Sequence, residues 1–122
     1  MLKPLLTALA TTLTLLGCAV ERARIGASSE EVVATYGPPS RTVALHTGSR
    51  LQYSRQPYGQ AAVMLDLDRA GTVVSVRQVL SANAFERIAV GEWTRETTER
   101  ELSHPAYIRH VAHWTGDILV YC

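Results

Sequence analysis

The sequence contains very little lysine and no block of basic residues. Lys3 is the only lysine, and the eleven arginines are scattered among 11 acidic residues in a chain of 122 residues with a formal net charge of +1. Removing residues 1–17 removes Lys3 and no acid, which leaves the remainder of the chain neutral. Proteins bind nucleic acid mainly through clustered basic side chains. We therefore expect no nucleic-acid partner.

The chain also lacks a hydrophobic run long enough to cross a membrane. The uncharged stretch over residues 4–16 would span about 20 Å as a helix, against roughly 30 Å for the hydrocarbon core of a bilayer. A short positive start followed by such a stretch is typical of a secretory signal peptide. We assign residues 1–17 to this signal peptide.

The end of the apolar stretch, Leu15-Leu16-Gly17-Cys18, resembles the lipobox of bacterial lipoproteins. This resemblance implies cleavage between Gly17 and Cys18, and a diacylglycerol thioether on the Cys18 thiol. Several acyl chains hold a protein stably on a bilayer. In the lipoprotein sorting rule Ala19 implies the outer membrane, with the protein on the periplasmic side, anchored in the inner leaflet. The alternative is an ordinary signal peptide followed by a chance cysteine.

Cysteine is scarce: the chain has only Cys18 and Cys122. A pair of cysteines in an oxidising compartment normally indicates a disulfide. If Cys18 carries lipid, however, Cys122 has no internal partner. We therefore expect an unpaired thiol at residue 122.

After a tether over residues 18–27, the sequence predicts a helix over residues 28–36. Ser28 and Glu31 have the spacing of a capping box, in which each side chain accepts a hydrogen bond from an early backbone N–H. Gly37, followed by two prolines, ends this helix.

The next residues alternate apolar and polar side chains or are rich in β-branched residues, both typical of strands. The predicted strands cover residues 41–45, 50–54, 61–67 and 72–80. Gly71 supplies the positive φ of a tight hairpin between the last two. The sequence therefore predicts an α+β fold, with short helices packed on an antiparallel meander of three to four strands.

Residues 85–122 repeat this order in part, as a helix followed by a hairpin. We expect a helix over residues 94–102, a strand over 107–113, a turn over 114–117 and a strand over 118–122. The spacings of the glycine and proline landmarks are similar in the two passes, which favours a degenerate duplication. Either the reading frame is truncated, or the second unit is a reduced helix–hairpin packed on the first.

Several short motifs together resemble the BamE (SmpA/OmlA) family of outer-membrane lipoproteins. They are the lipobox, Ile25-Gly26 before the Ser-Glu-Glu-Val helix, Gly37-x-Pro39, the aromatic strand at Tyr53, and the turn at Gly71. The resemblance covers about residues 18–80, with a family-like unit over 25–80 and a weaker echo over 85–122.

This resemblance implies two helices on a three-stranded antiparallel sheet, in an accessory subunit of the β-barrel assembly machinery. The chain departs from the family pattern at Ala27-Ser28, where a hydrophobic residue and threonine are usual. The two-pass arrangement is also similar to the tandem layout of β-lactamase-inhibitor-like proteins.

Candidate metal and catalytic residues are few. His104, His110, His113 and Cys122 are candidate zinc ligands, but His110 and His113 would point to opposite faces of one strand. We therefore expect no metal site and no cofactor.

Asp66 and Asp68 precede Gly71, yet the twelfth position counted from Asp66 is Arg77, where a calcium loop needs glutamate. We expect these two aspartates to be solvated turn residues. The chain has no phosphate-binding loop, nucleophile elbow or metalloprotease motif. We expect neither enzymatic activity nor a small-molecule substrate.

The aromatic residues are the better candidates for binding. Trp and Tyr are favoured at interfaces, where one end of the side chain is apolar and the other is wet. Tyr58 and Trp114, each beside a predicted loop glycine, are the candidate protein contacts. The expected function is a scaffold subunit in outer-membrane protein assembly and envelope integrity. The alternative is a lipid-anchored periplasmic inhibitor or immunity-type protein that binds an enzyme.

Overall fold

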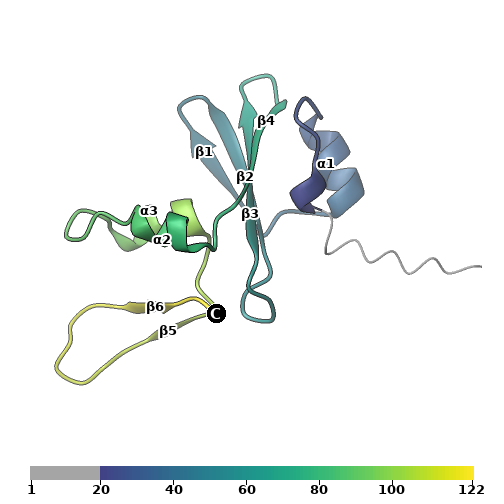
Figure 1. Ribbon diagram of the computed structural model, residues 1–122. Helices are drawn as coiled ribbons and strands as arrows, with labels where there is room; N and C mark the ends of the chain where they lie inside the picture. The colour runs from purple at the N-terminus through teal and green to yellow at the C-terminus, as the bar shows by residue number, and fades with distance from the viewer. Residues whose placement is uncertain (1–19) are drawn as a thin grey trace, which may run out of the picture.

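Four antiparallel strands form the centre of the fold, with helices on both sides (Figure 1). The computed structural model describes residues 20–122. In chain order the elements are η2 (Val20–Arg22), α1 (Ser29–Tyr36), β1 (Arg41–Leu45), β2 (Gly48–Ser54), β3 (Ala62–Asp68), β4 (Val73–Gln78), α2 (Ala82–Glu86), α3 (Arg95–Leu102), β5 (Tyr107–Arg109) and β6 (Ile118–Val120). The predicted α+β class and meander are confirmed.

The first helix begins at the predicted capping box. The Glu31 N–H donates to Ser28 Oγ at 3.1 Å, and the Ser28 N–H donates to a Glu31 carboxylate oxygen at 3.3 Å. Two of the backbone donors that have no partner inside the helix are satisfied in this way. The helix ends at Gly37, where φ is 83°.

The meander follows the predicted strands closely, in the order β1-β2-β3-β4. The turn between β3 and β4 is held by Asp68, whose Oδ1 accepts from the N–H groups of Ala70 and Thr72, each at 3.0 Å. Gly71 has a φ of 80°, as the hairpin requires. At the start of β2, Gly48 has a φ of 154°, and a Cβ there would collide with the Leu67 carbonyl.

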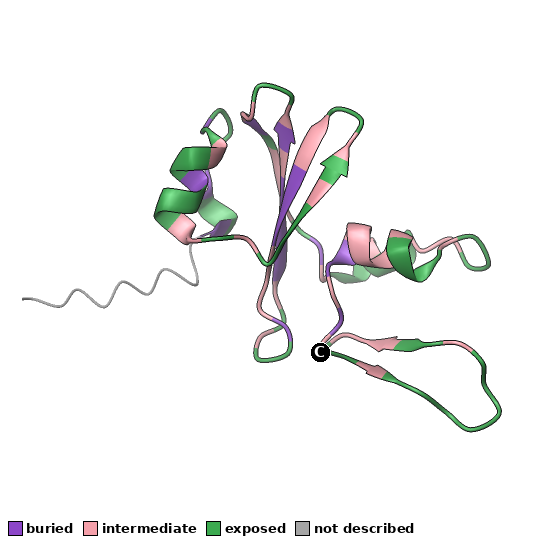
Figure 2. Ribbon diagram, turned by 180° about the vertical axis from the view of Figure 1, so that it is seen from behind, coloured by how far each residue is buried: buried purple, intermediate pink, exposed green. Residues whose placement is uncertain are grey.

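The two faces of the sheet are different. One face packs against α1 and η2 through an apolar core that includes Val32, Leu51 and Leu65. Burying a Val or Leu side chain contributes about 1.5–3 kcal/mol. The opposite face carries the directly paired residues Arg50 and Asp66, and α3 covers it. Figure 2 shows that burial is concentrated in the sheet.

The second part of the chain differs from the prediction at two points. A short helix, α2, follows β4 where no helix was predicted; its N-cap Ser81 accepts from the Ala84 N–H. The predicted strand over residues 107–113 is wrong in length, since β5 ends at Arg109. The chain then loops to β6 with a positive φ of 67° at His113. β5 and β6 form a separate two-stranded sheet.

The ends of α1 and α3 have the same geometry. Both helices have eight residues, and both are followed by a residue with positive φ and extended ψ, namely Gly37 and Ser103. In both cases a tyrosine hydroxyl from a later segment donates to the carbonyl of that residue at 2.8 Å, from Tyr53 to Gly37 and from Tyr121 to Ser103. The two helix ends are therefore alike, and the duplication of the whole unit stays a prediction.

The helices of the structure lie within residues 20–122. None of the helices there has the length and apolar character needed to cross a bilayer.

Candidate functional site

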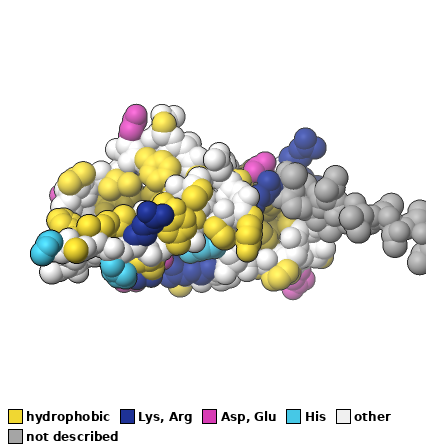
Figure 3. All heavy atoms as spheres, turned by 90° about the horizontal axis from the view of Figure 1, so that it is seen from below, with side chains coloured by type: hydrophobic (Ala, Val, Ile, Leu, Met, Phe, Trp, Pro, Cys, Tyr) yellow, Lys and Arg dark blue, Asp and Glu magenta, His cyan; other side chains and the backbone are white. Residues whose placement is uncertain are grey.

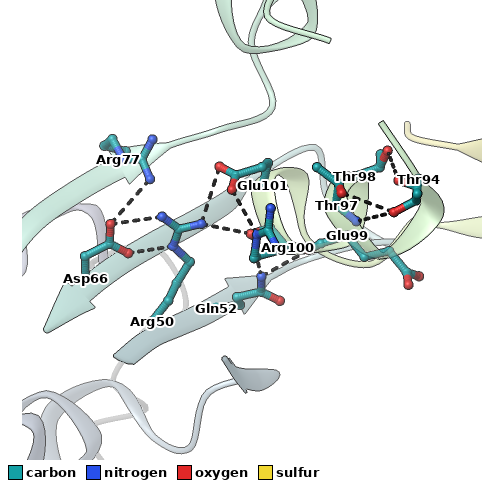
Figure 4. A network of polar contacts seen from close by, with 10 residues as sticks. All are labelled: Arg50, Gln52, Asp66, Arg77, Thr94, Thr97, Thr98, Glu99, Arg100 and Glu101. Atoms are coloured by element: carbon teal, nitrogen blue, oxygen red, sulfur yellow. Dashed lines mark hydrogen bonds and ion pairs between the residues drawn. The ribbon is translucent and has the colours of Figure 1, made fainter. Parts of the chain in front are cut away.

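A polar cluster, called the clamp below, joins the sheet to α3 (Figure 4). It consists of Arg50, Gln52, Asp66 and Glu101. Arg50 donates from Nε and from one terminal nitrogen to the two carboxylate oxygens of Asp66, at 2.6 and 3.0 Å. The other terminal nitrogen of Arg50 lies 3.4 Å from Glu101. This bidentate arrangement is the strong form of an arginine–carboxylate pair.

The clamp also binds the end of α3 through its backbone. The last carbonyls of a helix have no partner inside the helix and must be satisfied from outside. Arg50 donates to the carbonyl of Arg100 at 3.1 Å. Gln52 donates to the carbonyls of Glu99 and Arg100, each at 3.1 Å. The position of α3 is therefore fixed by donors on β2.

The charge of Arg50 is retained although its side chain is only 8% exposed. The hydrogen bond to Asp66 is the largest effect raising the pKa of Arg50 above its ordinary value, while burial acts in the opposite direction. A buried charge is tolerated only when it is paired and hydrogen-bonded. The clamp meets this condition, with Arg77 adding a 3.6 Å contact to Asp66.

The clamp corrects the prediction for one of the two aspartates. Asp68 is the last residue of β3, and its carboxylate holds the β3–β4 turn. Asp66 is not a solvated turn residue, because its side chain is 19% exposed and paired with Arg50. The sequence prediction missed this because Arg50 and Asp66 meet only through the register of β2 and β3. Alternation placed both residues on strands, but not opposite one another.

An open groove of about 500 Å³ lies between α2, α3 and β6. We call it the α3 groove. Aromatic and aliphatic side chains line it together with threonine, arginine and aspartate. Its lining comprises Phe85, Ile88, Trp93, Thr94, Arg95, Thr98, Leu102, Asp117, Leu119 and Tyr121. Binding sites commonly combine such an apolar lining with a few polar groups that fix orientation.

Tyr121 connects the two walls of the groove. Its ring meets Phe85 edge-on, with centroids 5.9 Å apart and an interplanar angle of 69°. Its hydroxyl donates to the carbonyl of Ser103. Burial is the main cause that raises the pKa of Tyr121 to about 12, with a smaller contribution from Glu99. The phenol therefore stays neutral over the physiological range.

The rim of the groove is charged. Arg95 on α3 contacts Asp117 in the β5–β6 loop at 2.9 Å and Glu99 at 3.6 Å. His110 lies 3.6 Å from the other carboxylate oxygen of Asp117. The ion pair between Arg95 and Asp117 joins the β5–β6 loop to α3 beside the groove.

Tyr58 and Trp114, the contact residues predicted from sequence, are 99% and 65% exposed. Neither lines the α3 groove. The aromatics that do line it are Phe85, Trp93 and Tyr121, and none of them was among the predicted contacts. One feature of the sequence pointed to the groove: Trp93 stands directly before Thr94, the N-cap of α3. The lipobox residues Gly17 and Cys18 lie outside the described residues.

The histidines and Cys122 are not gathered into one cluster. Within residues 20–122, no three histidine, cysteine or acidic side chains lie close enough together to hold a metal ion. The geometric reason given for separating His110 from His113 was wrong, because both follow the end of β5. Cys122 is exposed, and its backbone forms two hydrogen bonds with the buried side chain of Gln56.

Comparisons with models of known protein families, with curated proteins and with solved structures gave no match.

Proposed function

We propose that this chain is a lipid-anchored, non-catalytic scaffold subunit of the outer membrane that binds other proteins of β-barrel assembly. The observation that carries the proposal is the α3 groove, which presents apolar surface with a charged rim beside a helix fixed by the clamp. Such a groove suits an apolar side chain of a partner, flanked by polar contacts. Acylation at Cys18 and the resemblance to the BamE family complete the proposal.

The mechanism is one of local concentration. A module tethered to the inner leaflet meets its membrane-bound partners in two dimensions, so a weak contact becomes effectively intramolecular. The groove supplies that contact, and a binding site positioned before the partner arrives has a lower entropic cost of binding. The clamp contributes by keeping α3 in place when no partner is bound.

The test is affinity purification of the tagged, acylated protein from gently solubilised outer membranes. We expect the β-barrel insertase and its lipoprotein partners to co-purify, and Cys18→Ala to abolish their recovery. Thr98→Arg fills the groove and should also abolish it. Thr97→Arg is the matched control, because Thr97 is adjacent on α3 but does not line the groove.

Two results would contradict this function. Equal recovery of partners with Thr98→Arg and Thr97→Arg would show that the groove does not bind them. Recovery of the protein with one unrelated hydrolase, and without the insertase, would replace the assembly role with the inhibitor role.

A further inference from the structure

We propose that the protein makes a second contact with the bilayer, beside its anchor, through a surface that we call the lower surface. The lower surface consists of the β2–β3 loop (residues 55–61) and the β5–β6 hairpin (residues 107–120). Both lie on the lower side of Figure 1 and again in the opposite view of Figure 2. The partner is a lipid surface.

The two parts of the lower surface are held together. Gln56 in the β2–β3 loop is 6% exposed. Its side chain donates to the carbonyl of Cys122 at 2.9 Å and accepts from the Cys122 N–H at 3.1 Å. The β2–β3 loop is therefore joined directly to the end of the segment that follows β6.

The exposed side chains of this surface are those that favour a membrane interface. Trp and Tyr concentrate at the level of lipid headgroups, because their rings are apolar and their polar tips remain wet. Five of the exposed large hydrophobic residues of the described chain lie here: Tyr58, Tyr107, Val111, Trp114 and Ile118. Seen from below, the molecule shows hydrophobic side chains over much of this face (Figure 3).

The charge of the lower surface also suits a lipid surface. The β2–β3 loop contains no acidic residue, and the hairpin contains Arg109, whose guanidinium lies 5.0 Å from the centre of the Tyr107 ring. The only acid of the hairpin is Asp117, and Arg95 pairs with it at 2.9 Å. Anionic headgroups attract basic side chains close to a bilayer.

The first described residue lies beside the base of the β2–β3 loop. Val20 is the first described residue and follows Cys18 by two positions. It lines a groove of about 290 Å³ together with Arg55 and Ala61 of the β2–β3 loop. Two residues span at most about 7 Å, so an acylated Cys18 holds the lower surface close to the bilayer. The inference rests on the proposed function only through this anchor.

The two tryptophans give a direct test in the acylated protein. Trp93→Phe leaves Trp114 as the only tryptophan, and Trp114→Phe leaves Trp93. Each variant is reconstituted in vesicles of phosphatidylcholine with roughly one quarter phosphatidylserine, with and without bromine on the acyl chains. We expect brominated lipid to cause a loss of Trp114 emission and to leave Trp93 emission unchanged.

A second measurement removes the anchor from the comparison. The mature chain carrying Cys18→Ala is unacylated, and its binding to the same vesicles is measured by co-sedimentation. We expect Tyr58→Ala with Trp114→Ala to weaken binding roughly tenfold. Val90→Ala is the control: Val90 is 94% exposed but lies outside the lower surface, and its loss should leave binding unchanged.

The outcomes separate this proposal from the proposed function. Unquenched Trp114 in vesicle-bound protein, or equal binding of the Tyr58/Trp114 variant and the Val90 control, would overturn the bilayer contact. Loss of co-purified partners in the Tyr58/Trp114 variant, with Trp114 unquenched, would make the surface a protein interface instead. Absence of acyl chains on Cys18 in cells would remove the anchor, while the unacylated measurement would still decide the lipid contact.

Discussion

Replacing Ser103 with glycine is expected to stabilise the fold. Ser103 follows α3 with a φ of 72° and a ψ of −180°, a region of backbone conformation that is occupied almost only by glycine. The corresponding residue after α1 is Gly37, with a φ of 83° and a ψ of −176°. Ser103 is also 0% exposed, and its hydroxyl has no hydrogen-bond partner among the described residues.

The expected magnitude follows from three contributions. Relief of the backbone strain contributes about 1–3 kcal/mol, and removal of a buried, unpaired hydroxyl contributes about 1 kcal/mol or more. The greater freedom of glycine in the unfolded chain costs about 0.4–1 kcal/mol. The net stabilisation is about 2 kcal/mol, which raises Tm by about 10 °C for a domain of this size.

The assay is urea and thermal unfolding of the mature protein, followed by circular dichroism. Ser103→Ala is the matched control, because it removes the hydroxyl and keeps the strained φ; it should give only the smaller part of the gain. The converse change, Gly37→Ser, should destabilise. If Ser103→Gly left Tm unchanged or lowered it, the argument from strain would be refuted.

Three further predictions concern the sheet and the groove. Arg50→Met leaves Asp66 partly buried without its main partner and should cost about 3 kcal/mol in urea unfolding; equal stability of this variant and wild type would contradict the clamp. Gly48→Ala should lower Tm by more than 10 °C, because its Cβ would meet the Leu67 carbonyl and an ill-fitting backbone substitution costs about 2 kcal/mol or more. Because burial raises the pKa of Tyr121 to about 12, the folded state favours the neutral phenol. The stabilisation that comes from this raised pKa should be complete below about pH 10, the ordinary phenol pKa, and should be lost as the pH rises through about 12. Absorbance titration of wild type and Tyr121→Phe measures the pKa on which this expectation depends.

The sequence was sufficient for local structure in the first part of the chain. The capping box at Ser28 and the glycine at residue 71 act within a few residues of themselves, so their spacing predicted the helix start and the hairpin turn. The strand at residues 41–45 was predicted with its observed bounds. Such features depend on local backbone geometry, which tertiary contacts did not override here.

The candidate site could not be predicted in the same way, because its parts are distant in sequence. Arg50 meets the carbonyl of Arg100 across 50 positions, and Gln56 meets Cys122 across 66. Residues 110–113 contain apolar positions, so the sequence prediction extended β5 through them. These residues are exposed in the structure, which the sequence pattern could not show. Pairing and exposure depend on which face each segment presents, and that is settled by packing.

The polar clamp explains how this chain holds a highly charged helix on a sheet. α3 buries only one of its residues, Leu102, so apolar burial alone gives it little attachment. The missing attachment is supplied at its last turn, where carbonyls that have no partner inside the helix accept from Arg50 and Gln52. Apolar contacts allow a helix to slide, whereas hydrogen bonds to named carbonyls fix where the helix ends. The position of that end in turn places Ser103 and the hydroxyl of Tyr121, so three polar contacts from the sheet determine the shape of the α3 groove.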